Sequence, residues 1–72
     1  MAYRVYDIFI GKEEMWISPE NYPTRRNGRA LSELLQEVIN KLGTNGEKTV
    51  TLTFVSHDTH RDLRYFLLVT ES

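Results

Sequence analysis

The chain has 72 residues, a formal net charge of −1 and no cysteine. This length allows one small domain, and a chain without cysteine has no disulfide bond, thiolate metal site or cysteine nucleophile. The near-balanced charge gives no overall attraction to nucleic acid or anionic lipid, and the apolar content of 40% is typical of a folded globular domain. No stretch approaches the roughly 18 apolar residues of a membrane span, and the first residues lack the apolar run of a signal peptide, so we expect a cytoplasmic protein with no membrane partner.

The first part of the chain predicts a β-hairpin followed by a loop. Residues Tyr3 to Ile10 are mostly β-branched or aromatic, which predicts a strand, and the polar residues 11–14 predict a turn. The apolar run Met15 to Ile17 predicts a second strand that pairs with the first. Residues Glu20 to Gly28 include proline, asparagine and glycine without apolar periodicity, which predicts an exposed connection.

The middle of the chain predicts an amphipathic helix from about Gly28 to about Leu42. Either Asn27 or Thr24 is expected to cap its N-terminus, and Gly43 is expected to be the left-handed residue at its C-terminus. Apolar residues recur at the spacing of one helix face, at Leu31, Leu34, Leu35, Val38, Ile39 and Leu42.

The last part of the chain predicts a second hairpin. Threonines alternate with Val50, Leu52 and Phe54, a pattern typical of a half-buried strand, and the apolar run Leu63 to Val69 predicts its partner. The polar segment 56–62 between these two strands is short enough to connect them as antiparallel neighbours. The sequence therefore predicts a single α+β domain over residues 1–72. It is a small antiparallel β-sheet in the order β-β-α-β-β, with one amphipathic helix packed on one face.

One helix covers only one face of such a sheet, so some apolar residues are left over. If Val50, Leu52 and Phe54 face the helix, then Phe66 and Leu68 face away from it, joined by Val55. In residues 3–10, alternate side chains form two rows that both contain apolar residues, so the pattern does not show which row is buried. An apolar patch on a small domain is typical of an interface with a protein partner or a second copy, and we expect a homodimer through the face that carries Phe66 and Leu68. The simpler alternative is that loops or the first hairpin cover the patch, or that its residues are scattered.

Trp16 has two interpretations. Tryptophan is enriched among residues that anchor protein interfaces, and a tryptophan on a short strand can equally close the first hairpin.

Arg25, Arg26 and Arg29 form a basic segment just before the predicted helix, with Tyr22 as the nearest aromatic residue. Arginines beside a helix N-terminus can bind a phosphate, a nucleic-acid backbone or an acidic protein surface. The simpler alternative is a solvated loop whose arginines pair with Glu20 or Glu33.

The predicted tip of the second hairpin contains the residue types of a metal site or catalytic centre, namely Ser56, His57, Asp58, His60 and Asp62. A tight tip fixes ligand geometry poorly, and aspartates at such positions commonly cap their own turn. Adjacent strand residues point to opposite faces, so Ser56, His57 and Asp58 cannot relay a proton. No phosphate-loop or dinucleotide glycine pattern is present, so we expect no enzyme, no catalytic residues, no metal and no cofactor.

By elimination, the sequence favours a non-enzymatic protein-binding module. It would be a small regulator or inhibitor, of a kind that viruses also encode, that docks on a larger macromolecule through a sheet face or the arginine segment. The alternative is a small nucleic-acid-binding protein in which Arg25, Arg26 and Arg29 contact the backbone and aromatic residues of the sheet face stack on bases.

Overall fold

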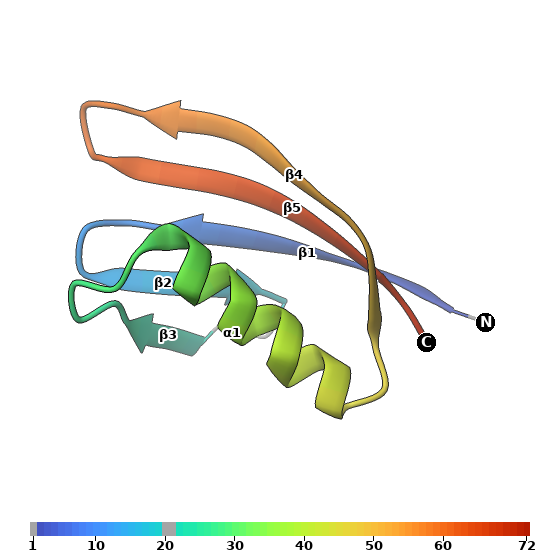
Figure 1. The fold of residues 1–72 in the computed structure, drawn as a ribbon. Helices are drawn as coiled ribbons and strands as arrows, with labels where there is room; N and C mark the ends of the chain where they lie inside the picture. Colours follow the sequence, from blue (N-terminus) through green and yellow to red (C-terminus); the bar gives the residue numbers. More distant parts are fainter. Residues whose placement is uncertain (1, 20–21) are drawn as a thin grey trace.

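The computed structural model describes residues 2–19 and 22–72, with the backbone alone for residues 22 and 23. Five antiparallel strands form one sheet in the spatial order β3-β2-β1-β5-β4, and one helix packs against it (Figure 1). This confirms the predicted α+β class. In chain order the elements are β1 (Tyr3–Ile10), β2 (Glu14–Ser18), β3 (Tyr22–Arg25), α1 (Leu31–Thr44), β4 (Lys48–Asp58) and β5 (Leu63–Glu71).

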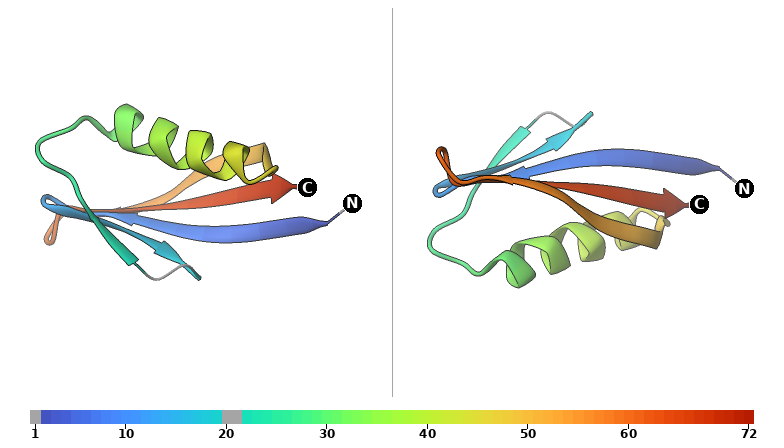
Figure 2. Two further views of the ribbon diagram at one scale, coloured as in Figure 1. Left: turned by 90° about the horizontal axis from the view of Figure 1, so that it is seen from below. Right: turned by 90° about the horizontal axis from the view of Figure 1, so that it is seen from above.

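The core lies between α1 and one face of the sheet, and Figure 2 shows the helix on that side only. Alternate residues of the adjacent strands β1 and β5 face this core, where Tyr6 lies opposite Leu68 and Ile8 opposite Phe66. The helix face predicted from the spacing of apolar residues supplies the second layer. The buried apolar residues are Tyr6, Ile8, Ile10, Met15, Ile17, Leu34, Val38, Leu42, Phe66 and Leu68.

The expected orientation of the last strand is wrong. Phe66 and Leu68 do not face away from the helix: their side chains are 8% and 0% exposed, in the core. Their neighbours Tyr65 and Leu67 are the residues that point to the other face. Both rows of this strand are apolar, so alternation alone could not choose between them, and the register with β1 decides the orientation.

The expected connection over 20–28 is wrong in part, because β3 occupies Tyr22–Arg25 and adds a fifth strand. Its Pro23 lies opposite Trp16 of β2. Proline cannot donate a ladder hydrogen bond and is tolerated in a strand mainly at a sheet edge, which is where β3 lies. Glu20 and Asn21 lie outside the described residues.

The helix ends also differ from the prediction. The helix begins at Leu31, after Ala30 as an N-cap without a side-chain hydrogen bond. The expected cap Asn27 lies instead in a turn before the helix, with φ of 52°. At the other end Gly43 remains helical, and the left-handed residue is Gly46, with φ of 85°.

A hydrogen-bonded carboxylate holds the start of β4 against the two central strands. The hydroxyl groups of Tyr6 and Thr70 each donate to Glu47 Oε1 at 2.7 Å. Both donors are fully buried. Tyr6 and Thr70 lie 41 and 23 positions from Glu47 in the chain, and no sequence motif predicted this cluster.

Candidate functional site

The face of the sheet opposite α1 is mostly apolar and, among the described residues, carries no covering element (Figure 2). Phe9 of β1 pairs with Trp16 of β2 and with Tyr65 of β5, which places three aromatic residues side by side. We call this surface the open face, and its apolar members are Val5, Phe9, Trp16, Tyr65, Leu67 and Val69. Val5 is 56% and Trp16 38% exposed, and the other four are half-buried.

Aromatic stacking and a hydrogen bond fix the centre of the open face. The rings of Phe9 and Tyr65 stack with centroids 4.7 Å apart and planes 10° from parallel. The Tyr65 hydroxyl donates to Asp7 Oδ1 on the neighbouring strand. This hydrogen bond to a carboxylate, followed by desolvation, raises the pKa of Tyr65 above its usual value. The stacking and the hydrogen bond therefore restrict the orientation of both rings.

One end of the open face is hollowed. A shallow cavity of about 510 Å³ lies between the β1–β2 turn and the β4–β5 tip. Gly11 borders it, and a Cβ atom there would come within 3.9 Å of the Trp16 ring and 3.8 Å of Leu63. The hollow thus has apolar walls beside charged side chains of both signs. Its lining residues are Gly11, Lys12, Glu13, Glu14, Trp16, Arg61 and Leu63.

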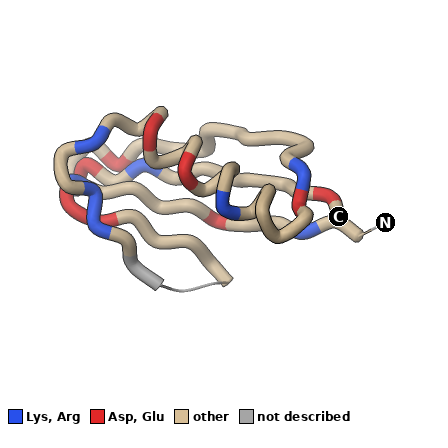
Figure 3. Tube along the Cα trace, turned by 60° about the horizontal axis from the view of Figure 1, so that its bottom comes forward, with Lys and Arg blue, Asp and Glu red and all other residues tan. Residues whose placement is uncertain are grey.

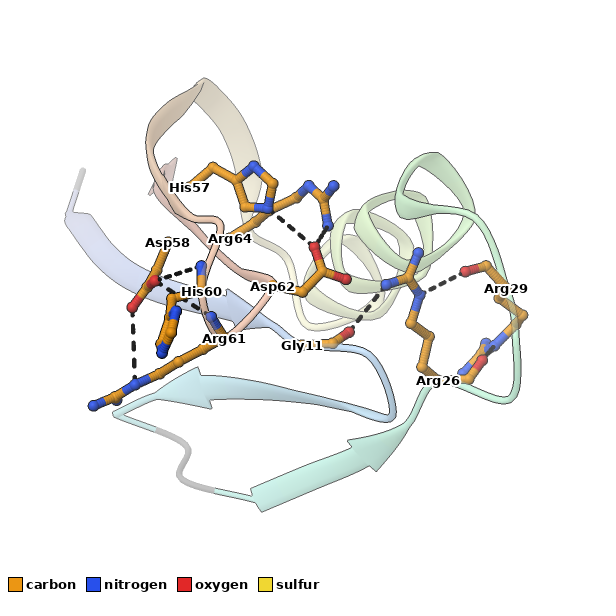
Figure 4. Close-up of polar contacts among 9 residues, drawn as sticks. All are labelled: Gly11, Arg26, Arg29, His57, Asp58, His60, Arg61, Asp62 and Arg64. Carbon is orange, nitrogen blue, oxygen red and sulfur yellow. Dashed lines mark hydrogen bonds and ion pairs between the residues drawn. The ribbon is translucent and has the colours of Figure 1, made fainter.

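The arginine segment is engaged mostly within the protein (Figure 4). The Arg26 guanidinium donates to the carbonyl oxygens of Arg29 at 2.8 Å and Gly11 at 3.0 Å. Arg29 donates to the carbonyls of Arg26 and Arg25 and pairs with Glu37, not with the expected Glu33. These contacts join the connection before α1 to the β1–β2 turn. Arg25 is exposed, and Tyr22 begins β3 but its side chain lies outside the described part.

At the β4–β5 tip, His57 contacts Asp62 and Asp58 contacts the backbone (Figure 4). His57 Nε2 lies 3.0 Å from Asp62 Oδ1, which also accepts a hydrogen bond from Arg64 at 3.1 Å. These neighbours, His57 foremost, lower the pKa of Asp62. Asp58 Oδ1 accepts from the amides of His60 and Arg61, the turn-capping role expected for it. Within the described residues no group of three or more histidine and acidic side chains is arranged to hold a metal ion.

Charged residues gather near the turns at one end of the sheet and near the termini at the other (Figure 3). The strand centres between them are mostly uncharged. Asp7 is the exception on β1, and it faces the hydroxyl of Tyr65. The centre of the open face is therefore mostly apolar, with Asp7 as its charged residue on β1.

The structure brings together only part of the predicted interface. Trp16 lies on the open face, whereas Phe66 and Leu68 are in the core. Val55 is 47% exposed, on β4 at a break in the register with β5. Sequence reasoning missed the open-face residues Phe9, Tyr65, Leu67 and Val69 as a site. The stacked pair comes from opposite ends of the chain, so only the β1–β5 register could have identified it.

No protein-family model, curated protein or solved structure matches this chain. Of the part of the chain that the structure describes, no helix has the length and apolar character needed to cross a membrane.

Proposed function

We propose that this protein is a non-enzymatic protein-binding module that docks on a larger partner through the open face. The observation that supports this most is the row of aromatic residues Phe9, Trp16 and Tyr65 across three neighbouring strands, with a hollow beside Trp16. Contiguous apolar surface on a small domain is typical of an interface, and tryptophan and tyrosine supply much of the binding energy at such surfaces. A module of this size acts as a regulator or inhibitor by covering part of its partner.

The hollow gives the proposed interface its anchor point. Its walls, Trp16 and Leu63, would bury an apolar side chain of the partner, and Lys12, Glu13 and Arg61 around them would contact polar groups at the rim. Because Phe9 and Tyr65 are already stacked, little side-chain entropy is lost on docking.

The same observations weigh against the nucleic-acid alternative. Phe9 and Tyr65 stack on one another, and the carboxylate of Asp7 lies beside them, where it would repel phosphate. Arg26 and Arg29 donate to main-chain carbonyls and are not directed at a common external point.

Affinity capture from cells that produce the protein tests the proposal when it compares variants. We expect a partner protein retained by the wild type to be lost with Trp16→Ala and with Val5→Arg. Gln36→Arg, on the exposed surface of α1, is the control and should retain it. Retention should survive nuclease treatment and depend weakly on salt. Loss on nuclease treatment, or on Arg25→Ala with the open-face variants unaffected, would instead support the nucleic-acid alternative.

A further inference from the structure

The outer edge of β4 differs in character from the edge at the other end of the sheet. β4 has 11 residues, and all but Thr49 and His57 are exposed. It carries no proline, and no lysine, arginine or acid stands between Lys48 and Asp58. The opposite edge, β3, has four residues that include Pro23 and Arg25. Short length, proline and charge protect sheet edges from pairing with other strands, as bulges also do. The β4 edge is long, has no proline and carries charge only at its two ends, and its two register breaks leave four regular residues between them.

The centre of β4 is regular and apolar on its helix side. The register with β5 is interrupted between Thr49 and Thr51 and between Phe54 and Ser56, so the residues from Thr51 to Phe54 form an unbroken ladder. Leu52 and Phe54 pair with the core residues Leu68 and Phe66, yet they are 37% and 56% exposed. No described β4 residue belongs to the buried cluster under α1. The core is thus open along this edge.

We propose that two copies of this chain associate by antiparallel pairing of their β4 strands, about a two-fold axis that passes through Thr53. Lys48 and Asp58 lie five positions before and after Thr53. With Thr53 opposite its own copy, Lys48 of each chain lies opposite Asp58 of the other. Leu52 likewise lies opposite Phe54 of the second copy. Two five-stranded sheets become one continuous sheet.

Matching of the two sheet faces supports this register. Lys48 and Asp58 pair with Glu71 and Leu63, which lie in the row of β5 that points away from the helix. Leu52 and Phe54 belong to the row on the helix side. In the proposed dimer each pair therefore has both members on one face. A shift by one residue would place apolar side chains against threonines and separate the charges.

Charge complementarity is the reason that the occupant is a second copy. Each chain supplies one cation and one anion at positions equidistant from the axis. Two identical strands therefore form two equivalent ion pairs. Asp58 uses Oδ1 for the turn amides, while Oδ2 has Arg61 Nε at 3.8 Å and remains accessible to Lys48 of the second copy. None of the apolar members of the open face lies on β4, so the dimer does not depend on the proposed function.

Sedimentation equilibrium of the purified chain tests the association, with Thr53→Lys as the main variant. We expect wild-type dimers with a dissociation constant on the order of micromolar to tens of micromolar, as suits a small interface. Two lysines facing each other on the axis should raise that constant at least about tenfold. The same charge added by Gln36→Lys, on the exposed side of α1, should leave it unchanged. A wild type that stays monomeric up to about 1 mM, or equal weakening by both variants, would overturn the proposal.

Charge reversal tests the register. Lys48→Glu alone should weaken the dimer about three- to tenfold, because each two-fold pair becomes a like-charge contact. Adding Lys48→Glu to Asp58→Lys should strengthen the dimer relative to Asp58→Lys alone, since the two ion pairs return with reversed sign. Absence of that recovery would reject the register. A dimer that survives Thr53→Lys but is lost with Trp16→Ala would reject the β4 edge in favour of the open face.

Discussion

At the scale of single residues, Glu47 shows how one side chain can connect three parts of the fold. It lies between α1 and β4 and accepts hydrogen bonds from Tyr6 of β1 and Thr70 of β5. Both hydroxyl groups are buried and would lack an acceptor without it, and an unsatisfied buried donor costs about 1–3 kcal/mol. The Tyr6 hydrogen bond is also the main reason that the pKa of Glu47 lies below 4.5, its usual value.

The lowered pKa of Glu47 predicts a specific loss of stability in acid. Because folding lowers this pKa, the ionised carboxylate contributes stability above about pH 4.5, and that contribution disappears as the pH falls through the folded-state value. Glu47→Gln should cost about 1–2 kcal/mol at neutral pH and show a shallower decline in acid than the wild type. Urea unfolding at several pH values measures both. Wild-type and variant curves that run parallel below pH 4.5 would contradict this assignment.

The glycines at the end of α1 predict substitutions of opposite sign. Gly43 is helical, and a Cβ atom there would meet nothing within 4 Å. Gly43→Ala should therefore raise the free energy of unfolding by about 0.5–1 kcal/mol. Gly46 has φ of 85°, where a side chain is strained, so Gly46→Ala should lower it by about 1 kcal/mol. Denaturant unfolding of the two variants is the measurement, and a loss of stability at Gly43 would show that the helix ends earlier.

At the scale of elements, α1 provides one side of the core. Comparing the same substitution at two adjacent leucines of α1 distinguishes the effect of burial from that of helix propensity. Leu34 is fully buried, whereas Leu35 is half-buried at the border of the core. Leu34→Ala should cost about 3–4 kcal/mol, and Leu35→Ala about 1–2 kcal/mol. The substitution is the same at both sites, so the difference in urea midpoints reports burial alone. Equal costs would mean that the helix is rotated relative to the sheet.

The elements that the sequence predicted are those with a single consistent pattern. The apolar spacing from Leu31 to Leu42 admits only one helix face. Every predicted residue of that face except Ile39 belongs to the buried core or packs against it. β3 was missed because four residues that include Pro23 carry no readable alternation. The faces of β5 could not be assigned because Phe66 and Leu68 alternate with residues equally apolar. For the candidate site, the sequence predicted Trp16 as an interface residue, while the pairing of Phe9 with Tyr65 depends on strand register.

At the scale of the whole molecule, the two central strands come from opposite ends of the chain. β1 pairs with β5 along its full length, from Tyr3 opposite Glu71 to Ile10 opposite Arg64. Beyond these strands, Ala2 and Ser72 exchange two backbone hydrogen bonds of 3.0 and 2.9 Å. The two ends therefore lie together, as Figure 1 shows. Forming this central pair requires closure of nearly the whole chain, which costs loop entropy before any core contact is gained.

Joining the ends of the chain should therefore stabilise the fold and speed its formation. A short Gly/Ser linker from Ser72 back to the N-terminus closes a loop of about 70 residues, for which the chain-entropy relation gives about 4 kcal/mol as an upper value. We expect an increase of about 2–4 kcal/mol in the free energy of unfolding and a larger folding rate, because the unfolded circular chain already holds β1 near β5. Stopped-flow refolding and urea titration measure both quantities, with the open chain carrying the same linker residues as the control. If the circular chain were no more stable than this control and folded no faster, closure of the β1–β5 pair would not be the costly step that the topology implies.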